Sequence, residues 1–68
     1  MFEGFVARVN LDKGFGFLAA VDQPDVFFHC NELSDELPFD ERLRGRRVRF
    51  YVESGRKGLR AVAITPAE

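Results

Sequence analysis

The feature that most constrains the fold is a series of five short β-type segments separated by turn residues. Phe and Val dominate the first segment, and in the fourth apolar and polar residues alternate with the period of a strand that buries one face. In that fourth segment one face would carry Val48, Phe50 and Val52, and the other would carry Arg47, Arg49 and Tyr51. The predicted strands cover residues 2–9, 15–21, 26–29, 46–53 and 59–65.

The length of the chain decides how five such strands are arranged. With 68 residues, one domain covering 1–68 is expected. Closing a small sheet on itself removes its exposed edges, so all-β chains of this size commonly form barrels. We therefore predict a five-stranded antiparallel barrel of the OB type. A long polar connection follows the third strand over 30–45, with one helical turn near 31–36 capped by Asn31.

Composition excludes several classes of function. Cys30 is the only cysteine, which excludes an intramolecular disulfide and a cysteine-based zinc site. No apolar run reaches membrane-spanning length and no signal-peptide pattern is visible, so a cytoplasmic protein is expected. A barrel this small has little room for an enclosed cleft beside its core. We expect no enzymatic activity, no metal, no cofactor and no small-molecule substrate.

Charge is distributed unevenly along the chain. Residues 1–41 contain two basic and nine acidic residues, whereas residues 42–68 contain eight basic and two acidic ones. The net charge of −1 lacks the strongly basic balance typical of many nucleic-acid-binding domains, but a local basic surface remains open. The arginine-rich run at 42–49 is interpreted as a solvated basic face.

Aromatic residues recur at alternate positions in the second and third predicted strands, in "KGFGF" at 13–17 and "VFFH" at 26–29. Residues two apart on a strand share a face. The opposite face already supplies a core set, which argues against the simpler interpretation that all these rings are core. That core set is Leu18, Val26 and Phe28. The outer set, a flat exposed patch, is Lys13, Phe15, Phe17, Phe27 and His29.

An exposed patch of this kind suits the stacking of unpaired bases. Each base stacked on an aromatic ring contributes about 1–3 kcal/mol with little sequence preference, while nearby cations contact phosphates. Single-stranded DNA or RNA is therefore the predicted partner. A stacking surface accepts both nucleic acids, so the sequence does not distinguish between them.

The stretches "DKGFGFL" and "DVFFH" resemble the two RNP-type motifs of the cold-shock domain family. "EGFVARVN" and "VESGRKGLRAVAIT" resemble its opening strand and its closing loop and strand, so nearly the whole chain is covered. The resemblance implies an OB-type barrel that binds single-stranded DNA and RNA, as an RNA chaperone or a regulator of transcription or translation. The binding residues that it implies are Lys13, Phe15, Phe17, Phe27, His29, Phe39 and Arg56.

The chain departs from the family pattern at the edge of this surface. Where the family usually has Lys-Trp-Phe, the sequence has Ala7, Arg8 and Val9, and Cys30 replaces another Phe. A planar guanidinium stacks on bases and pairs with phosphates, so Arg8 is added to the predicted binding residues. We expect binding that is weaker and more dependent on salt than an all-aromatic surface would give.

A second hypothesis remains open at this point. The missing aromatics and the acidic balance also suit a divergent cold-shock fold that serves protein interaction or dimerisation, with weak affinity for nucleic acid. A monomer is expected, and a dimer is left open.

Overall fold

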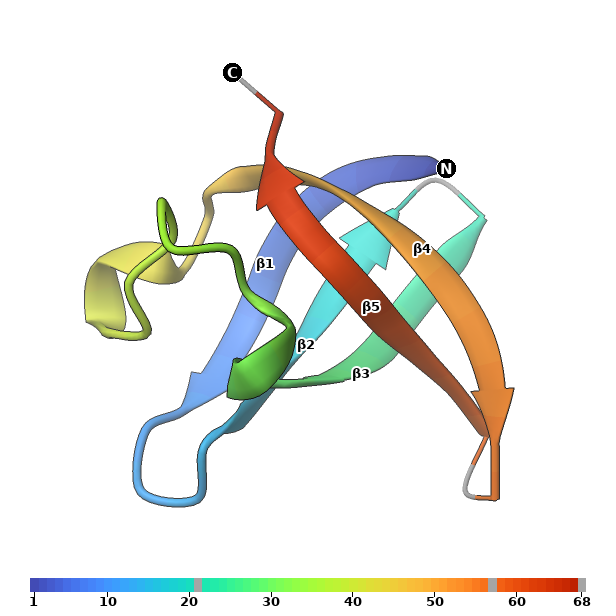
Figure 1. Ribbon diagram of the computed structural model, residues 1–68, viewed down its shortest axis with the longest axis horizontal. Coiled ribbons are helices and arrows are strands. Elements are labelled where there is room, and N and C mark those ends of the chain that lie inside the picture. The colour runs from blue at the N-terminus through green and yellow to red at the C-terminus, as the bar shows by residue number, and fades with distance from the viewer. Residues whose placement is uncertain (21, 57, 68) are drawn as a thin grey trace.

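The computed structural model describes residues 1–20, 22–56 and 58–67, and of these the side chains of residues 23 and 24 are left undescribed. Five strands form one closed barrel, as predicted, and their order around it is β1-β2-β3-β5-β4 (Figure 1). The strands are β1 (Phe2–Asn10), β2 (Phe15–Ala20), β3 (Gln23–His29), β4 (Arg47–Gly55) and β5 (Gly58–Pro66). Two short 3₁₀ helices lie in the connection between β3 and β4, namely η1 (Cys30–Glu32) and η2 (Glu41–Leu43).

Two contacts between distant strands close the barrel. β1 pairs antiparallel with β4, from Phe2 opposite Phe50 to Phe5 opposite Arg47. β3 runs parallel to β5, a departure from the fully antiparallel pairing predicted, with Phe27 in register with Arg60. The remaining neighbours, β1–β2, β2–β3 and β4–β5, are antiparallel hairpins. The parallel contact places the outer face of β3 next to the start of β5.

The core follows the predicted alternation and extends beyond it. Val48 and Phe50 are fully buried, and Val52 packs against the core from its margin. The long connection, interpreted from its polar composition as a loop, contributes Leu37 and Leu43 to the core. The buried apolar residues of the described chain are Val6, Leu18, Val26, Phe28, Leu37, Leu43, Val48, Phe50, Ala61 and Ile64.

Gly16 is required by close packing inside the barrel. A Cβ atom at this position would lie 2.5 Å from the backbone oxygen of Arg8 and 2.7 Å from the ring of Phe28. The absence of a side chain therefore lets β1 and β2 approach each other over the ring of Phe28. Gly14, in contrast, lies in the turn before β2 and has a φ of 77°, which glycine adopts without strain.

Element boundaries differ from the sequence prediction by one or two residues in β1, β4 and β5, and by more around β3 and the short helix. Val21, predicted as the last residue of a strand, lies outside the described residues, and β3 begins at Gln23 within the stretch predicted as a turn. The short helix begins earlier than predicted, and its cap is His29 instead of Asn31. His29 caps it because its Nδ1 accepts a hydrogen bond from the backbone N–H of Asn31 at 3.1 Å.

Candidate functional site

Four side chains on the outer face of β2 and β3 form what we call the aromatic platform: Phe15, Phe17, Phe27 and His29. The register pairs Phe15 with His29 and Phe17 with Phe27 across the two strands. Between them, Leu18, Val26 and Phe28 point into the core and are buried. The predicted division of these two strands into an inner and an outer face is therefore observed.

The three rings of the platform do not form a flat patch. The centroids of Phe15 and Phe27 are 5.5 Å apart, with ring planes inclined by 36°. Phe17 stands nearly edge-on to both, at 6.0 Å and angles of 88° and 74°. Edge-to-face contact is a preferred geometry for aromatic pairs because of their quadrupoles. The surface is consequently faceted, and each ring is partly covered by its neighbours.

Arg8 belongs to this surface because of a β-bulge. In a regular strand Arg8 would share the inward face of Val6, but the register shifts between these two residues, so that Val6 pairs with Leu18 and Arg8 with Phe17. The guanidinium carbon of Arg8 lies 4.7 Å from the centroid of the Phe17 ring. This distance is that of a cation–π contact. One face of Phe17 is therefore already covered by a cation.

Lys13 and His29 occupy the end of the platform near the β1–β2 turn. Lys13 lies in that turn and not in β2, so strand alternation does not determine its direction; its side chain is exposed, and its backbone N–H donates to Oδ1 of Asn10 at 3.2 Å. His29 is also exposed. Because its Nδ1 accepts the hydrogen bond that caps η1, the neutral ring carries its proton on Nε2, which can donate to a ligand.

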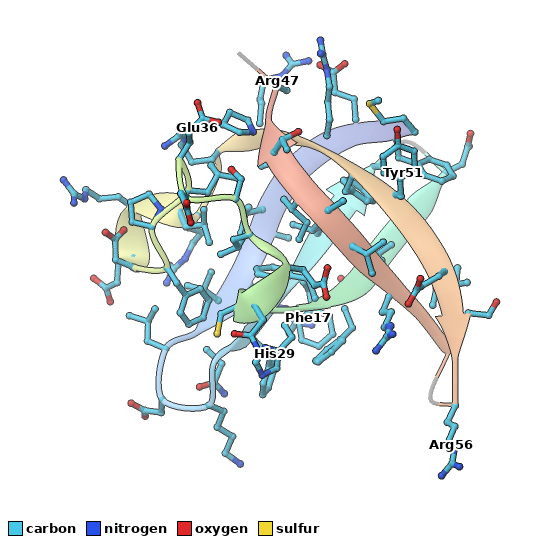
Figure 2. The ribbon with its side chains drawn as sticks, viewed as in Figure 1. Phe17, His29, Glu36, Arg47, Tyr51 and Arg56 are labelled. Carbon is cyan, nitrogen blue, oxygen red and sulfur yellow. The ribbon has the colours of Figure 1, made fainter. Side chains whose placement is uncertain are left out.

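Two hollows flank the platform. The first, of about 310 Å³, adjoins Arg8 and is lined by Arg8, Val9, Asn10, Phe15 and Phe17. The second, of about 550 Å³, extends toward the β4–β5 hairpin and is lined by Phe17, Phe27, Gly55, Arg56, Gly58, Leu59 and Arg60. Figure 2 shows Phe17 and His29 on the same side of the barrel, Arg56 at the tip of the hairpin, and Arg47 and Tyr51 at the opposite side.

The second hollow contains a residue that the sequence prediction missed. Leu59 is 46% exposed and lies beside Phe17 and Phe27, which are distant in sequence. Arg60, in the same hollow, donates to Oε1 of Glu53 from Nε at 3.0 Å and from Nη2 at 2.6 Å. Arg56 is exposed, and its neighbour Lys57, which the sequence placed in the same basic cluster, lies outside the described residues.

Phe39 is located apart from the other predicted residues. It lies in the connection between η1 and η2, is partly buried and packs against the core. It does not line either of the two hollows beside the platform. A binding role for Phe39 therefore stays a prediction that rests on the family resemblance.

The arginine run at 42–49 is engaged mainly with nearby carboxylates. Arg42 pairs with Asp40 at 3.2 Å, and Arg47 and Arg49 both approach Glu3, at 2.9 and 3.8 Å. These are exposed ion pairs, consistent with a solvated basic face.

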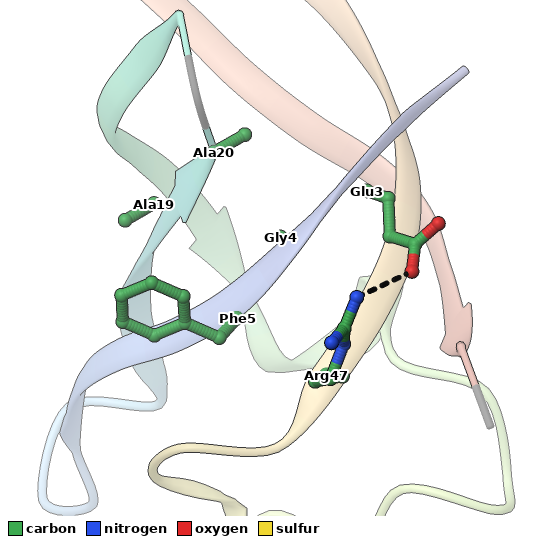
Figure 3. A pocket seen from close by; sticks show the side chains of 6 residues that line it. All are labelled: Glu3, Gly4, Phe5, Ala19, Ala20 and Arg47. Atoms are coloured by element: carbon green, nitrogen blue, oxygen red, sulfur yellow. Dashed lines mark hydrogen bonds and ion pairs between the residues drawn. The ribbon is translucent and has the colours of Figure 1, made fainter.

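A third hollow lies beside one of these ion pairs. It measures about 400 Å³, and the ion pair between Arg47 and Glu3 lies at its margin (Figure 3). Phe5, 48% exposed, contributes apolar surface to it. The residues that line it are Glu3, Gly4, Phe5, Ala19, Ala20 and Arg47, so it shares none with the platform.

Two further searches concern other kinds of site. Within the described ranges, no group of three or more His, Cys, Asp and Glu side chains is arranged to hold a metal ion. None of the helices in the same ranges has the length and apolar character needed to cross a membrane.

The arrangement of strands and platform agrees with comparisons to known proteins. Residues 2–67 match the family model described as the 'Cold-shock' DNA-binding domain. The chain belongs to the cold-shock domain family. Members of this family generally bind nucleic acids. The first stretch that resembles an RNP-type motif covers the β1–β2 turn and β2, and the second lies on β3.

Curated relatives align along almost the full chain. The major cold shock protein of Streptococcus pyogenes serotype M1 is 38% identical over 65 residues, covering 96% of both chains. Cold shock protein ScoF of Streptomyces coelicolor is 40% identical over 68 residues, covering 98% of this chain and all of the relative. The cold shock-like protein CspB of Escherichia coli is 39% identical over 62 residues, 90% of this chain and 86% of that one.

A solved structure also shares the fold. The Drosophila Unr CSD456 structure superposes with a TM-score of 0.78 at 29% identity. The alignment covers 98% of this chain but only 26% of that larger one. The OB-type barrel predicted from the sequence is thereby confirmed.

Proposed function

We propose that this cold-shock domain protein binds single-stranded DNA or RNA across the aromatic platform. Bases stack on Phe15, Phe27 and His29, while Arg8, Lys13 and Arg56 contact phosphates or base edges. The observation that carries the proposal is the gathering of three aromatic rings and the Arg8 guanidinium on one outer face.

The two hollows beside the platform support a path for an extended strand. One adjoins Arg8 on β1 and the other adjoins Arg56 at the β4–β5 turn, and Phe17 lines both. A strand that crosses the platform from one hollow to the other places its backbone near a cation at each end. Each stacked base then contributes about 1–3 kcal/mol.

Charge determines how strongly this binding depends on salt. The net charge of −1 provides no overall attraction for a polyanion, so attraction must come from local cations beside the platform. Each phosphate neutralised on a single strand contributes about 0.7 to the log–log salt slope. Because a cation covers one face of Phe17, binding depends more on charge than it would on a purely aromatic surface.

Such binding would let a single domain over residues 1–68 act as an RNA chaperone or as a regulator of transcription or translation. A protein that binds unpaired strands better than duplexes shifts the equilibrium toward the unpaired form by its difference in affinity. Stacking with little sequence preference would spread this effect over many RNA segments.

Titration with fluorescent pyrimidine-rich strands of about 6–10 nucleotides at two salt concentrations tests the proposal. We expect binding at low salt, and a loss of about 1–3 kcal/mol for each of the variants Phe15→Ala and Phe27→Ala. Tyr51→Ala removes an aromatic ring that is 50% exposed on the opposite side, and should leave affinity unchanged. Absence of binding at low salt would overturn the proposal and favour the protein-interaction hypothesis.

A further inference from the structure

The hollow beside Arg8 has an unusual set of hydrogen-bonding groups. The guanidinium of Arg8 carries five N–H donors and no acceptor. Within residues 1–20, 22–56 and 58–67, no carboxylate pairs with Arg8, so its donors are available at the surface. Its contact with the ring of Phe17, at 4.7 Å, restrains the guanidinium without using those donors.

Asn10 adds further donors to the same hollow. Its Oδ1 already accepts the backbone N–H of Lys13, at 3.2 Å, which leaves its amide N–H groups available. The other lining side chains, Val9, Phe15 and Phe17, supply apolar and aromatic surface. The donors of Arg8 and Asn10 favour a ligand that presents hydrogen-bond acceptors to them. The aromatic lining favours a ligand with a flat ring.

Among the bases, guanine presents such acceptors most clearly. Its O6 and N7 are two adjacent acceptors, which arginine contacts in a bidentate manner. On the corresponding edge adenine offers an acceptor beside a donor, thymine an acceptor beside a methyl group, and cytosine a donor. Unpaired cytosine also exposes two adjacent acceptors, O2 and N3, so cytosine is the base that the experiment must separate from guanine. In unpaired strands these edges are free to be read by side chains.

We infer that the hollow beside Arg8 is a guanine-selective subsite, in which the Arg8 guanidinium donates to O6 and N7 of one unpaired base lying against Phe15 and Phe17. The inference rests on the proposed function and deepens it. Stacking on the platform accepts any base, whereas this single position selects one.

The experiment compares thymine strands of about eight nucleotides in which one guanine replaces each thymine in turn. At one position, guanine should bind roughly five- to tenfold more tightly than thymine, the lower part of the range for a bidentate contact because the site is open to solvent. Adenine and cytosine at that position should give no such gain. 7-Deazaguanine, which lacks the N7 acceptor, should lose most of it.

Three variants attribute the preference to its residues, with the ratio of guanine to thymine affinity as the readout. Arg8→Lys keeps the charge but lacks the planar fork, and should bring the ratio close to one. Asn10→Asp keeps the oxygen that accepts from Lys13 but replaces donors by an acceptor, and should also lower the ratio. Arg47→Lys, which changes an arginine on the opposite side of the barrel, should retain the full ratio.

The outcomes separate this inference from the proposed function. Binding of the thymine strand with no gain from guanine at any position overturns the subsite alone. A ratio that survives in Arg8→Lys, or an equal gain from cytosine, overturns it as well. Failure to bind any strand overturns the proposed function and the subsite together.

Discussion

Phe27 and Phe28 are adjacent in the chain, but one side chain lies on the outer face of the barrel and the other in its core. Phe28 is 0% exposed and lies among the largest core side chains, whereas Phe27 faces outward and contacts the rings of Phe15 and Phe17. The chemistry of the two side chains is identical, so only the direction set by strand alternation distinguishes them. A small barrel can therefore use the same residue type to stabilise its core and to form an aromatic outer surface.

The largest effect is expected from removing the inner ring. Phe28→Ala should lower the free energy of unfolding by about 3–5 kcal/mol, because it deletes a fully buried ring and leaves a cavity. Phe27→Ala, the matched change on the outer face, should cost well under half as much. Urea denaturation followed by circular dichroism measures both.

Domains are typically stable by about 5–15 kcal/mol, and small ones are marginal, so Phe28→Ala comes close to the limit of folding. If that variant does not fold, Phe28→Leu preserves most of the volume and should still be less stable than Phe27→Leu. Equal losses at the two positions would show that the inner and outer faces are not energetically distinct.

A smaller loss of folding stability is expected from substitution of Gly16, which lies on the inner face of β2 between Phe15 and Phe17 of the platform. Gly16→Ala introduces a Cβ atom 2.5 Å from the backbone oxygen of Arg8, and such overpacking typically costs about 1–3 kcal/mol. Gly55→Ala is the control, since the nearest atom to its new Cβ, the backbone oxygen of Gly58, would lie at 3.5 Å, an ordinary contact. Thermal unfolding compares the two. A stability of Gly16→Ala equal to that of Gly55→Ala would contradict close packing at Gly16.

The direction of side chains could be predicted from the sequence wherever a strand is regular. β2 and β3 alternate without interruption from Phe15 to Leu18 and from Val26 to His29, so the sequence predicts correctly which of these side chains point inward and which point outward. Alternation could not place Arg8, because the bulge after Val6 reverses its direction and nothing in the local sequence marks the extra residue.

Long-range contacts account for the remaining differences. The hollow containing Leu59 exists because β3 and β5 meet in parallel, a contact between segments far apart in the chain. The connection between β3 and β4 lacks any periodic pattern, so its buried residues Leu37 and Leu43 could not be recognised as core. A chain this short must nevertheless use such residues to fill its barrel.

The smallest effect on stability is expected from releasing Arg60, which lies beside the platform in an ion pair with Glu53. Glu53→Gln releases Arg60 from an exposed ion pair, and should change the free energy of unfolding by less than about 1 kcal/mol. Because Arg60 lines the hollow beside Phe27, its release should strengthen binding at low salt and steepen the log–log slope by about 0.7, the contribution of one phosphate contact. Affinity measured over a series of salt concentrations gives the slope.

The matched control for that change is Glu3→Gln, which releases Arg47 and Arg49 away from the platform. It removes the same negative charge, so any general effect of net charge appears in both variants. A steeper slope in Glu53→Gln alone would show that position, and not total charge, decides which arginine contacts the strand. Equal salt slopes in the two variants would show that Arg60 does not contact the nucleic acid. The interface would then not extend along β5 as far as Arg60.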